Sequence, residues 1–299
     1  MGRIECVPNF SDGRDESVAA EIRAAIRAPL GVRLLDWHAD PDHNRSVATF
    51  AGEPGAVAEA AFAAISVAAR RIDLKLHQGV HPRMGATDVC PFVPLGREDM
   101  PLCVSLARAL GQRVGRELEI PVYFYGEAAL RPERRALPEV RRGGFELLRE
   151  AIGRDPTRTP DAGPARVHPN AGAIAIGARG FLIAFNVNLE STDLALAREI
   201  ARSIRASNGG LPGIRALGFR LERAGRVQVS INVCEPERTG LPAVFEAVEG
   251  LARARGVAVR ESELVGLAPR SFLDASIARA VRLRGFDARR YVLEEALDA

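Results

Sequence analysis

Length, composition and charge place the chain among ordinary globular proteins. Its 299 residues, 47% of them hydrophobic, are enough to bury a core and favour two domains over one. The net charge of +3 argues against a nucleic-acid partner, because such proteins concentrate basic residues on one face. No apolar run is long enough to span a bilayer, and the N-terminus lacks a signal-peptide core, so we predict a cytoplasmic protein without a membrane partner.

The first half of the chain alternates between strand and helix patterns. Strands are predicted at residues 3–8, 32–38, 46–52, 88–95 and 121–125, and helices at 15–27, 54–71, 98–118 and within 131–151. Ser11 or Asp12 is placed to cap the first helix. Residues 153–170 are rich in Pro, Gly, Asp and Arg, which predicts a loop or a linker.

The second half repeats the order seen near the start of the first. Strands predicted at 181–188, 214–222, 227–233 and 257–261, with helices at 192–206 and 241–255, give β-α-β-β-α-β, the ferredoxin-like order. We therefore predict an α+β fold of two ferredoxin-like α/β sandwich subdomains, residues 1–178 and 179–299. They are expected to pack with a ligand cleft between them.

Three polar segments are candidates for a functional site. Residues 77–88 hold His77, His81, Arg83 and Asp88, and glycines and prolines there exclude the helical spacing of an HxxxH metal site. An active-site loop and a plain surface loop are equally compatible with that pattern. No CxxC pair occurs among the four cysteines, and we predict reduced thiols and no metal.

The other two segments are also ambiguous. In residues 36–46 we favour turn formation for Asp42 and Asn44 and leave His43 and Arg45 open as ligand contacts. Residues 163–173 could wrap a flat polar ring or form an interdomain connection, and they are not a P-loop.

Long ordered motifs resemble the formiminotransferase family. They are ECVPNFSDGR at 5–14, PDHNRSV at 41–47, HPRMGATDVCPFVP at 81–94, GAIAIGAR at 172–179, FLIAFNVNL at 181–189 and SELVGL at 262–267. The resemblance implies N- and C-terminal formiminotransferase subdomains. Longer members continue into a cyclodeaminase domain, so it also implies transfer without cyclisation of the product.

The resemblance implies roles for particular residues. His81 matches the catalytic histidine of the family, although Val80 stands where the family commonly has Glu. The segment that matches the folate loop is Gly163, Pro164, Ala165, Arg166, Val167, His168, Pro169, Asn170, Ala171 and Gly172. The implied co-substrate is tetrahydrofolate, the implied partners are formiminoglutamate and folate polyglutamates, and a homodimer is expected.

The expected reaction moves a formimino group between glutamate and N5 of tetrahydrofolate. His81 is the hypothetical proton shuttle, since a histidine titrates near neutral pH. Arg83 and Arg45 are candidates to bind carboxylates, the alternative being ion pairs with Asp88 or Asp40. Asp40 could orient a histidine or stabilise the cationic amidine, and a turn cap is equally compatible with its position.

Two other functions stay open at this point. A relative could act on 5-formyltetrahydrofolate, which the change to Val80 allows. A non-catalytic folate-binding protein would keep the loop at 163–172 yet would not need His81. The intact HPRMGA motif argues against that second alternative.

Overall fold

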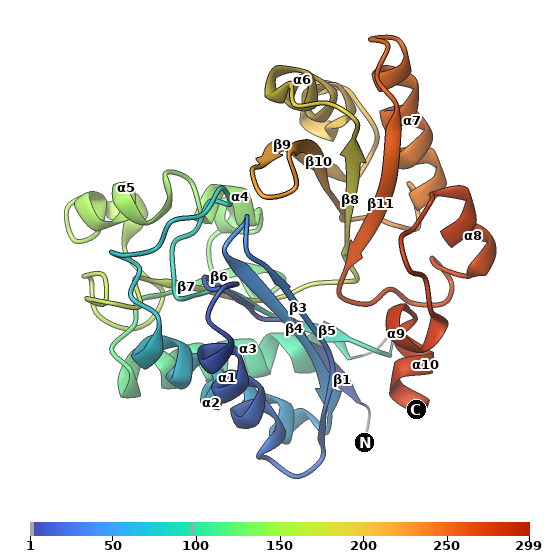
Figure 1. The fold of residues 1–299 in the computed structure, drawn as a ribbon. Coiled ribbons are helices and arrows are strands. Elements are labelled where there is room, and N and C mark those ends of the chain that lie inside the picture. Colours follow the sequence, from blue (N-terminus) through green and yellow to red (C-terminus); the bar gives the residue numbers. More distant parts are fainter. Residues whose placement is uncertain (1–2, 97–98) are drawn as a thin grey trace. The chain divides into compact units, whose positions relative to one another are not determined.

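In the computed structural model, which describes residues 3–96 and 99–299, the chain divides into two units between Gly180 and Phe181 (Figure 1). Each unit has its own sheet and its own apolar core. The fold is thus α+β with two separate sheets. None of the helices in the described part of the chain is long and apolar enough to cross a membrane.

Unit 1 is a mixed sheet covered by helices. Its strands are β1 (Ile4–Cys6), β2 (Asn9–Phe10), β3 (Val32–Asp40), β4 (Arg45–Gly52), β5 (Thr87–Pro94), β6 (Val122–Gly126) and β7 (Ile174–Ala178). The short strands β1 and β2 follow each other between β4 and β5, β3 lies beyond β4, and β7 and β6 extend the other edge. The pairings of β3 with β4 and of β1 with both β4 and β5 are antiparallel, whereas β7 pairs in parallel with β5 and β6.

The helices of unit 1 fall into two groups. The long ones are α1 (Glu16–Arg27), α2 (Pro54–Arg71) and α3 (Met100–Glu117), and they cover one face of the sheet with an alanine-rich core (Figure 1). Two short ones, α4 (Leu137–Val140) and α5 (Gly144–Ala151), pack on a smaller apolar cluster that includes Met84 and Tyr123. This second group lies beside the segment that carries His81.

Unit 2 has the order β-α-β-β-α-β followed by three short helices. The elements are β8 (Ile183–Leu189), α6 (Leu194–Ile204), β9 (Ile214–Leu221), β10 (Arg226–Val233), α7 (Leu241–Arg253), β11 (Val259–Val265), α8 (Ala275–Ala280), α9 (Ala288–Tyr291) and α10 (Leu293–Asp298). The sheet order is β11-β8-β10-β9, and every neighbouring pair is antiparallel. Residues 153–170 lie inside unit 1, because the chain returns from them into β7, a strand that the sequence did not predict.

The predicted cap of the first helix is wrong. Asp15, not Ser11 or Asp12, accepts hydrogen bonds from the backbone of α1 at Ser17 and Val18. Asp12 instead accepts from the backbone nitrogens of Arg14 and Asp15, and so shapes the turn before the helix. The Ser11 hydroxyl donates to the Gly85 carbonyl at 2.7 Å, which anchors the segment that follows His81.

Candidate functional site

A buried carboxylate organises the segment around His81. Asp88 is 0% exposed, and its Oδ1 accepts a hydrogen bond from the Met84 backbone nitrogen at 2.8 Å. Its Oδ2 accepts from Arg45 Nη1 at 2.8 Å and from Arg141 Nη2 at 2.6 Å. Burial raises the pKa of Asp88, but the Arg141 and Arg45 guanidinium groups outweigh it, so the pKa lies below its ordinary value. One carboxylate therefore faces two cations.

His81 lies next to this cluster with a defined tautomer. Its Nδ1 is 2.8 Å from the Pro82 carbonyl oxygen, and since a carbonyl only accepts, Nδ1 carries the proton. Nε2 is therefore the basic nitrogen. Burial lowers the pKa of His81 well below its ordinary value, and the positive charges of Arg45 and Arg141 lower it further. The ring is therefore neutral at pH 7.

Arg45 forms an ion pair with Asp88, one of the two roles that the sequence left open for it. Besides Asp88, its Nε and Nη2 donate to Asn9 Oδ1 at 3.1 and 2.9 Å. Its side chain is 9% exposed, and burial lowers the pKa of the guanidinium group. Arg45 thus shares an internal hydrogen-bond network with Asn9, a residue that sequence reasoning missed.

Asp40 caps the turn at residues 40–44, and Asn44 occupies a left-handed position at its end. Asp40 Oδ1 accepts from the backbone nitrogens of Asp42 and His43, both at 2.8 Å. Asn44 has a positive φ of 48° and bridges segments, accepting from Gly13 N and donating to the Gln78 carbonyl, both at 3.0 Å. Asp40 therefore forms the turn cap that was one of its two interpretations.

Arg83 connects the His81 segment to α5. Its two terminal nitrogens donate to Glu146 at 2.9 and 2.7 Å, a bidentate pair that the sequence did not predict. Its Nε donates to His77 Nδ1 at 3.1 Å, and the other ring nitrogen of His77 is 3.0 Å from the Asn44 carbonyl oxygen. His77 therefore receives and gives hydrogen bonds inside the loop, which is a structural role.

The segments at 77–86 and 163–172 lie side by side. Backbone hydrogen bonds run from Ala86 N to the Ala171 carbonyl at 2.9 Å and from Ala173 N to the Met84 carbonyl at 3.0 Å. Gly85 and Gly172 form a bridge at the centre, where a Cβ on Gly85 would be 1.8 Å from the Ala173 carbonyl oxygen. Only glycine permits this approach, so the sequence contains the reason that the two segments meet.

The second segment is closed by its own histidine. His168 Nδ1 accepts from the backbone nitrogens of Asn170 and Ala171 at 3.3 and 2.9 Å. The backbone of His168 also exchanges two hydrogen bonds with Gly172, at 2.8 and 3.0 Å. Arg166 lies on the surface and pairs with Glu119 at 2.9 Å. His168 thus holds the end of the loop as a compact turn.

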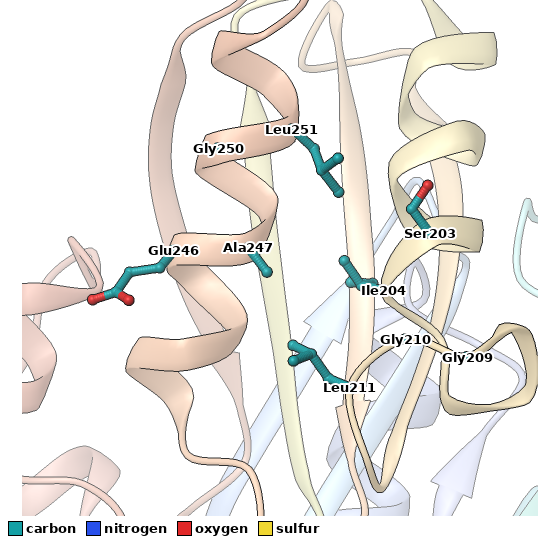
Figure 2. Close-up of a pocket in the computed structure, with 9 residues that line it drawn as sticks. All are labelled: Ser203, Ile204, Gly209, Gly210, Leu211, Glu246, Ala247, Gly250 and Leu251. Carbon is teal, nitrogen blue, oxygen red and sulfur yellow. The ribbon is translucent and has the colours of Figure 1, made fainter.

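Unit 2 carries polar groups of another kind. Asn186 Nδ2 donates to Glu263 Oε1 at 3.0 Å, and Gln228 Nε2 reaches both Asn188 and Glu263 at 3.0 and 2.9 Å. A separate groove of about 550 Å³ lies between the end of α6 and α7 (Figure 2). Ile204, Leu211 and Leu251 line it, and none of the predicted site residues does. Neither feature includes a histidine.

The sequence matches two models of one protein family, which together cover most of the chain. The family model for the formiminotransferase domain, N-terminal subdomain, matches residues 3–179, and the formiminotransferase domain model matches residues 184–282. The chain belongs to the formiminotransferase family.

Named relatives extend over nearly the whole chain. A glutamate formimidoyltransferase of Thermoplasma acidophilum is 47% identical over 96% of this chain and 95% of its own length. One from Streptococcus pyogenes is 41% identical over 98% of both chains. The rat formimidoyltransferase-cyclodeaminase is 44% identical over 91% of this chain, which corresponds to 51% of its own length.

Proposed function

We propose that this chain is a glutamate formimidoyltransferase, which transfers the formimino group between N-formimino-L-glutamate and tetrahydrofolate. The two near-full-length relatives with that name support the reaction. The observation that carries the mechanism is His81, a neutral imidazole whose Nδ1 proton is held by the Pro82 carbonyl. Tetrahydrofolate is the co-substrate in this proposal, and no metal takes part.

The chemistry requires one proton to move between two amines. N5 of tetrahydrofolate attacks the amidine carbon, and the C–N bond to glutamate breaks after a tetrahedral intermediate has formed. In the proposal, Nε2 of His81 takes the proton from the attacking nitrogen and delivers it to the glutamate nitrogen as that nitrogen leaves. General acid–base help of this kind typically accelerates a reaction by about 10² to 10⁴.

The charges around His81 support an anionic substrate. Arg45 and Arg141 bring two positive charges to the single carboxylate of Asp88. Arg83 contacts the substrate in this proposal by exchanging its partner, because Glu146 is 61% exposed and a substrate carboxylate offers the same bidentate geometry. Arg45 acts from its buried position through its charge. Asp40 takes part indirectly, by fixing the turn that carries His43.

The loop at 163–172 is the proposed folate contact. Its hydrogen bonds to residues 84–86 support the assignment, since they hold the folate loop against the His81 segment. This arrangement suits a reaction in which N5 of the folate must meet the amidine carbon.

The proposal also includes finer points of fold and setting. The sheet order β11-β8-β10-β9 and its counterpart β5-β1-β4-β3 in unit 1 support two ferredoxin-like sandwiches, unit 1 being extended by β7 and β6. Four free cysteines are compatible with the cytoplasm. The homodimer and the binding of folate polyglutamates stay predictions.

The decisive experiment is transfer from N-formiminoglutamate to tetrahydrofolate by the purified protein and by His81→Ala. We expect turnover by the wild type, a kcat lower by about 10² to 10⁴ for the variant, and a nearly unchanged Kd for tetrahydrofolate. Turnover of 5-formyltetrahydrofolate in place of formiminoglutamate would reject the proposed donor. Equal loss of folate binding and turnover in His81→Ala would reject the proposed role of His81.

A further inference from the structure

Arg141 joins two groups that flank His81. It follows α4 directly, and its side chain is 18% exposed. Its Nη2 donates to Asp88 Oδ2 at 2.6 Å and also to the Pro82 carbonyl oxygen. Nothing in the sequence marked it, because it stands in an arginine-rich segment between residues 131 and 158.

The Pro82 carbonyl oxygen is shared by two donors. Arg141 Nη2 reaches it from α4, and His81 Nδ1 reaches it at 2.8 Å from the preceding residue. A carbonyl oxygen has two lone pairs and accepts both hydrogen bonds. Its direction therefore decides which imidazole nitrogen carries the proton, and Arg141 is the side chain that holds this direction.

We propose that Arg141 is a positioning residue that fixes the Pro82 carbonyl and, through it, keeps the proton of His81 on Nδ1 and the basic lone pair on Nε2. This inference rests on the proposed role of His81. Asp88 supports this arrangement, because one of its oxygens accepts a hydrogen bond from the Arg141 guanidinium group and the other accepts one from the Met84 backbone nitrogen. The segment from residue 82 to residue 84 is thus fixed at both ends.

The charge of Arg141 has a second effect on the same ring. His81 faces the cations Arg45 and Arg141 and the ring of His43, whose centroid is 6.0 Å from its own. Both cations pair with the buried carboxylate of Asp88. Loss of Arg141 leaves one cation balanced by one carboxylate. The pKa of His81 then rises, and the neutral fraction of the ring below pH 7 falls.

The kinetic test compares Arg141→Met with Arg142→Met. Arg142 is the matched control, because it is exposed and pairs with Glu139 on the surface. We expect Arg141→Met to lower kcat by about 10- to 100-fold, a part of the effect of a general base, with little change in KM. The acid limb of its kcat/KM profile moves to higher pH, whereas Arg142→Met keeps the wild-type profile.

Nuclear magnetic resonance of the imidazole ring tests the contact without turnover. The protein has five histidines, and His81→Gln assigns the signals of His81 by their loss. Nitrogen shifts report the tautomer, and we expect Nδ1–H in the wild type and a mixture with Nε2–H, with a raised pKa, in Arg141→Met. Arg141→Lys, which keeps the charge, serves if the first variant does not fold; we expect a mixed tautomer with a pKa near that of the wild type.

The outcomes separate the two proposals. A wild-type protein without formimino transfer whose His81 still changes tautomer in the Arg141 variants would remove the proposed function and leave the contact standing. A folded Arg141 variant with the wild-type tautomer and pKa would overturn the positioning role, whatever its activity. A rise in KM alone, with an unchanged kcat and an unchanged acid limb, would also overturn the positioning role.

Discussion

The two loops that meet at Gly85 and Gly172 use histidine in opposite ways. In the loop at 77–86, His81 Nδ1 faces a carbonyl oxygen and carries a proton. In the loop at 163–172, His168 Nδ1 faces two backbone N–H groups and carries a lone pair. Burial lowers the pKa of both rings, and both are neutral at pH 7. The same residue type thus presents a protonated Nδ1 in one loop and an accepting Nδ1 in the other.

The difference follows from what the backbone offers each ring. Pro82 presents a carbonyl oxygen to His81, which places the proton on Nδ1 and the lone pair on Nε2. Asn170 and Ala171 present amide donors to His168, which consume the basic nitrogen of that ring. We therefore expect loss of His81 to lower kcat and loss of His168 to raise KM for the folate.

The largest expected effect tests the role proposed for His81 in this comparison. His81→Gly lowers kcat by about 10² to 10⁴ because the general base is lost. Added imidazole restores part of the turnover, since a small base can enter the space of the missing ring. His168→Gly is the matched control, and it gains nothing from imidazole because its ring holds a loop. Equal rescue of both variants would abolish the distinction.

The next effect separates the two loops from each other. Gly85→Ala places a Cβ 1.8 Å from the Ala173 carbonyl oxygen and 2.7 Å from that of Thr87. Backbone atoms cannot yield cheaply, so we expect a loss of about 2–4 kcal/mol in the free energy of unfolding by urea denaturation. In the surviving folded fraction, kcat falls and KM for tetrahydrofolate rises together, because both loops move.

Gly250→Ala is the control for that substitution. Gly250 lies within α7 and has nothing within 4 Å of an added Cβ. The change is expected to stabilise unit 2 by about 0.5–1 kcal/mol through helix propensity, with unchanged kinetics. A Gly85→Ala protein as stable as this control would show that the two loops are not held together at Gly85.

Much of the fold was predictable because its signals are local. The predicted helix at 54–71 and the strand pair around the turn at 40–44 agree with α2, β3 and β4, since proline, alanine periodicity and turn residues are all written in the segment itself. β7 escaped prediction because its sequence, IAIGA, is short, and its place between β5 and β6 depends on long-range pairing.

The site was predictable only in part, for the same physical reason. The roles of His81 and of the loop at 163–172 stay predictions that come from the family resemblance, whereas the contacts around His81 come from distant positions. Arg141 and Asp88 are 53 residues apart, and Arg83 and Glu146 are 63 apart. One sequence does not say which of many arginines meets which carboxylate. The cap of α1 was misplaced for a local reason, because Asp15 caps the helix and neither Ser11 nor Asp12 does.

A smaller effect tests the structural half of the comparison. His168→Leu leaves the backbone nitrogens of Asn170 and Ala171 without an acceptor, and we expect KM for tetrahydrofolate to rise about 5- to 10-fold with kcat within twofold. His168→Asn supplies a side-chain oxygen as acceptor and is expected to recover most of the affinity. A large fall in kcat for His168→Leu, with unchanged KM, would instead give His168 a chemical role.

The smallest effect is a dependence of KM on pH. Burial lowers the pKa of His168 and the nearby Arg166 lowers it further, while Glu119 opposes them. Nδ1 accepts hydrogen bonds only when it is unprotonated. The hydrogen bonds from Asn170 and Ala171 are therefore intact above this lowered pKa and are lost as the pH falls through it. The neutral His168 ring also stabilises the folded state, because its pKa is lower there than in the unfolded chain. This stabilisation is fully present above the unfolded pKa of about 6.5 and is lost as the pH falls through the lowered pKa of the folded state.

We therefore expect KM for tetrahydrofolate to stay constant from pH 8 to 7 and to rise as the pH falls below the ordinary histidine value of about 6.5. The rise is limited by the roughly 5- to 10-fold effect expected for His168→Leu. His168→Asn removes the titrating group and should keep KM flat over the same range. The acid limb of kcat, which the proposed mechanism assigns to His81, should survive in His168→Asn. A KM that still rises in that variant would move the titration to another group and leave His168 as a static part of the loop.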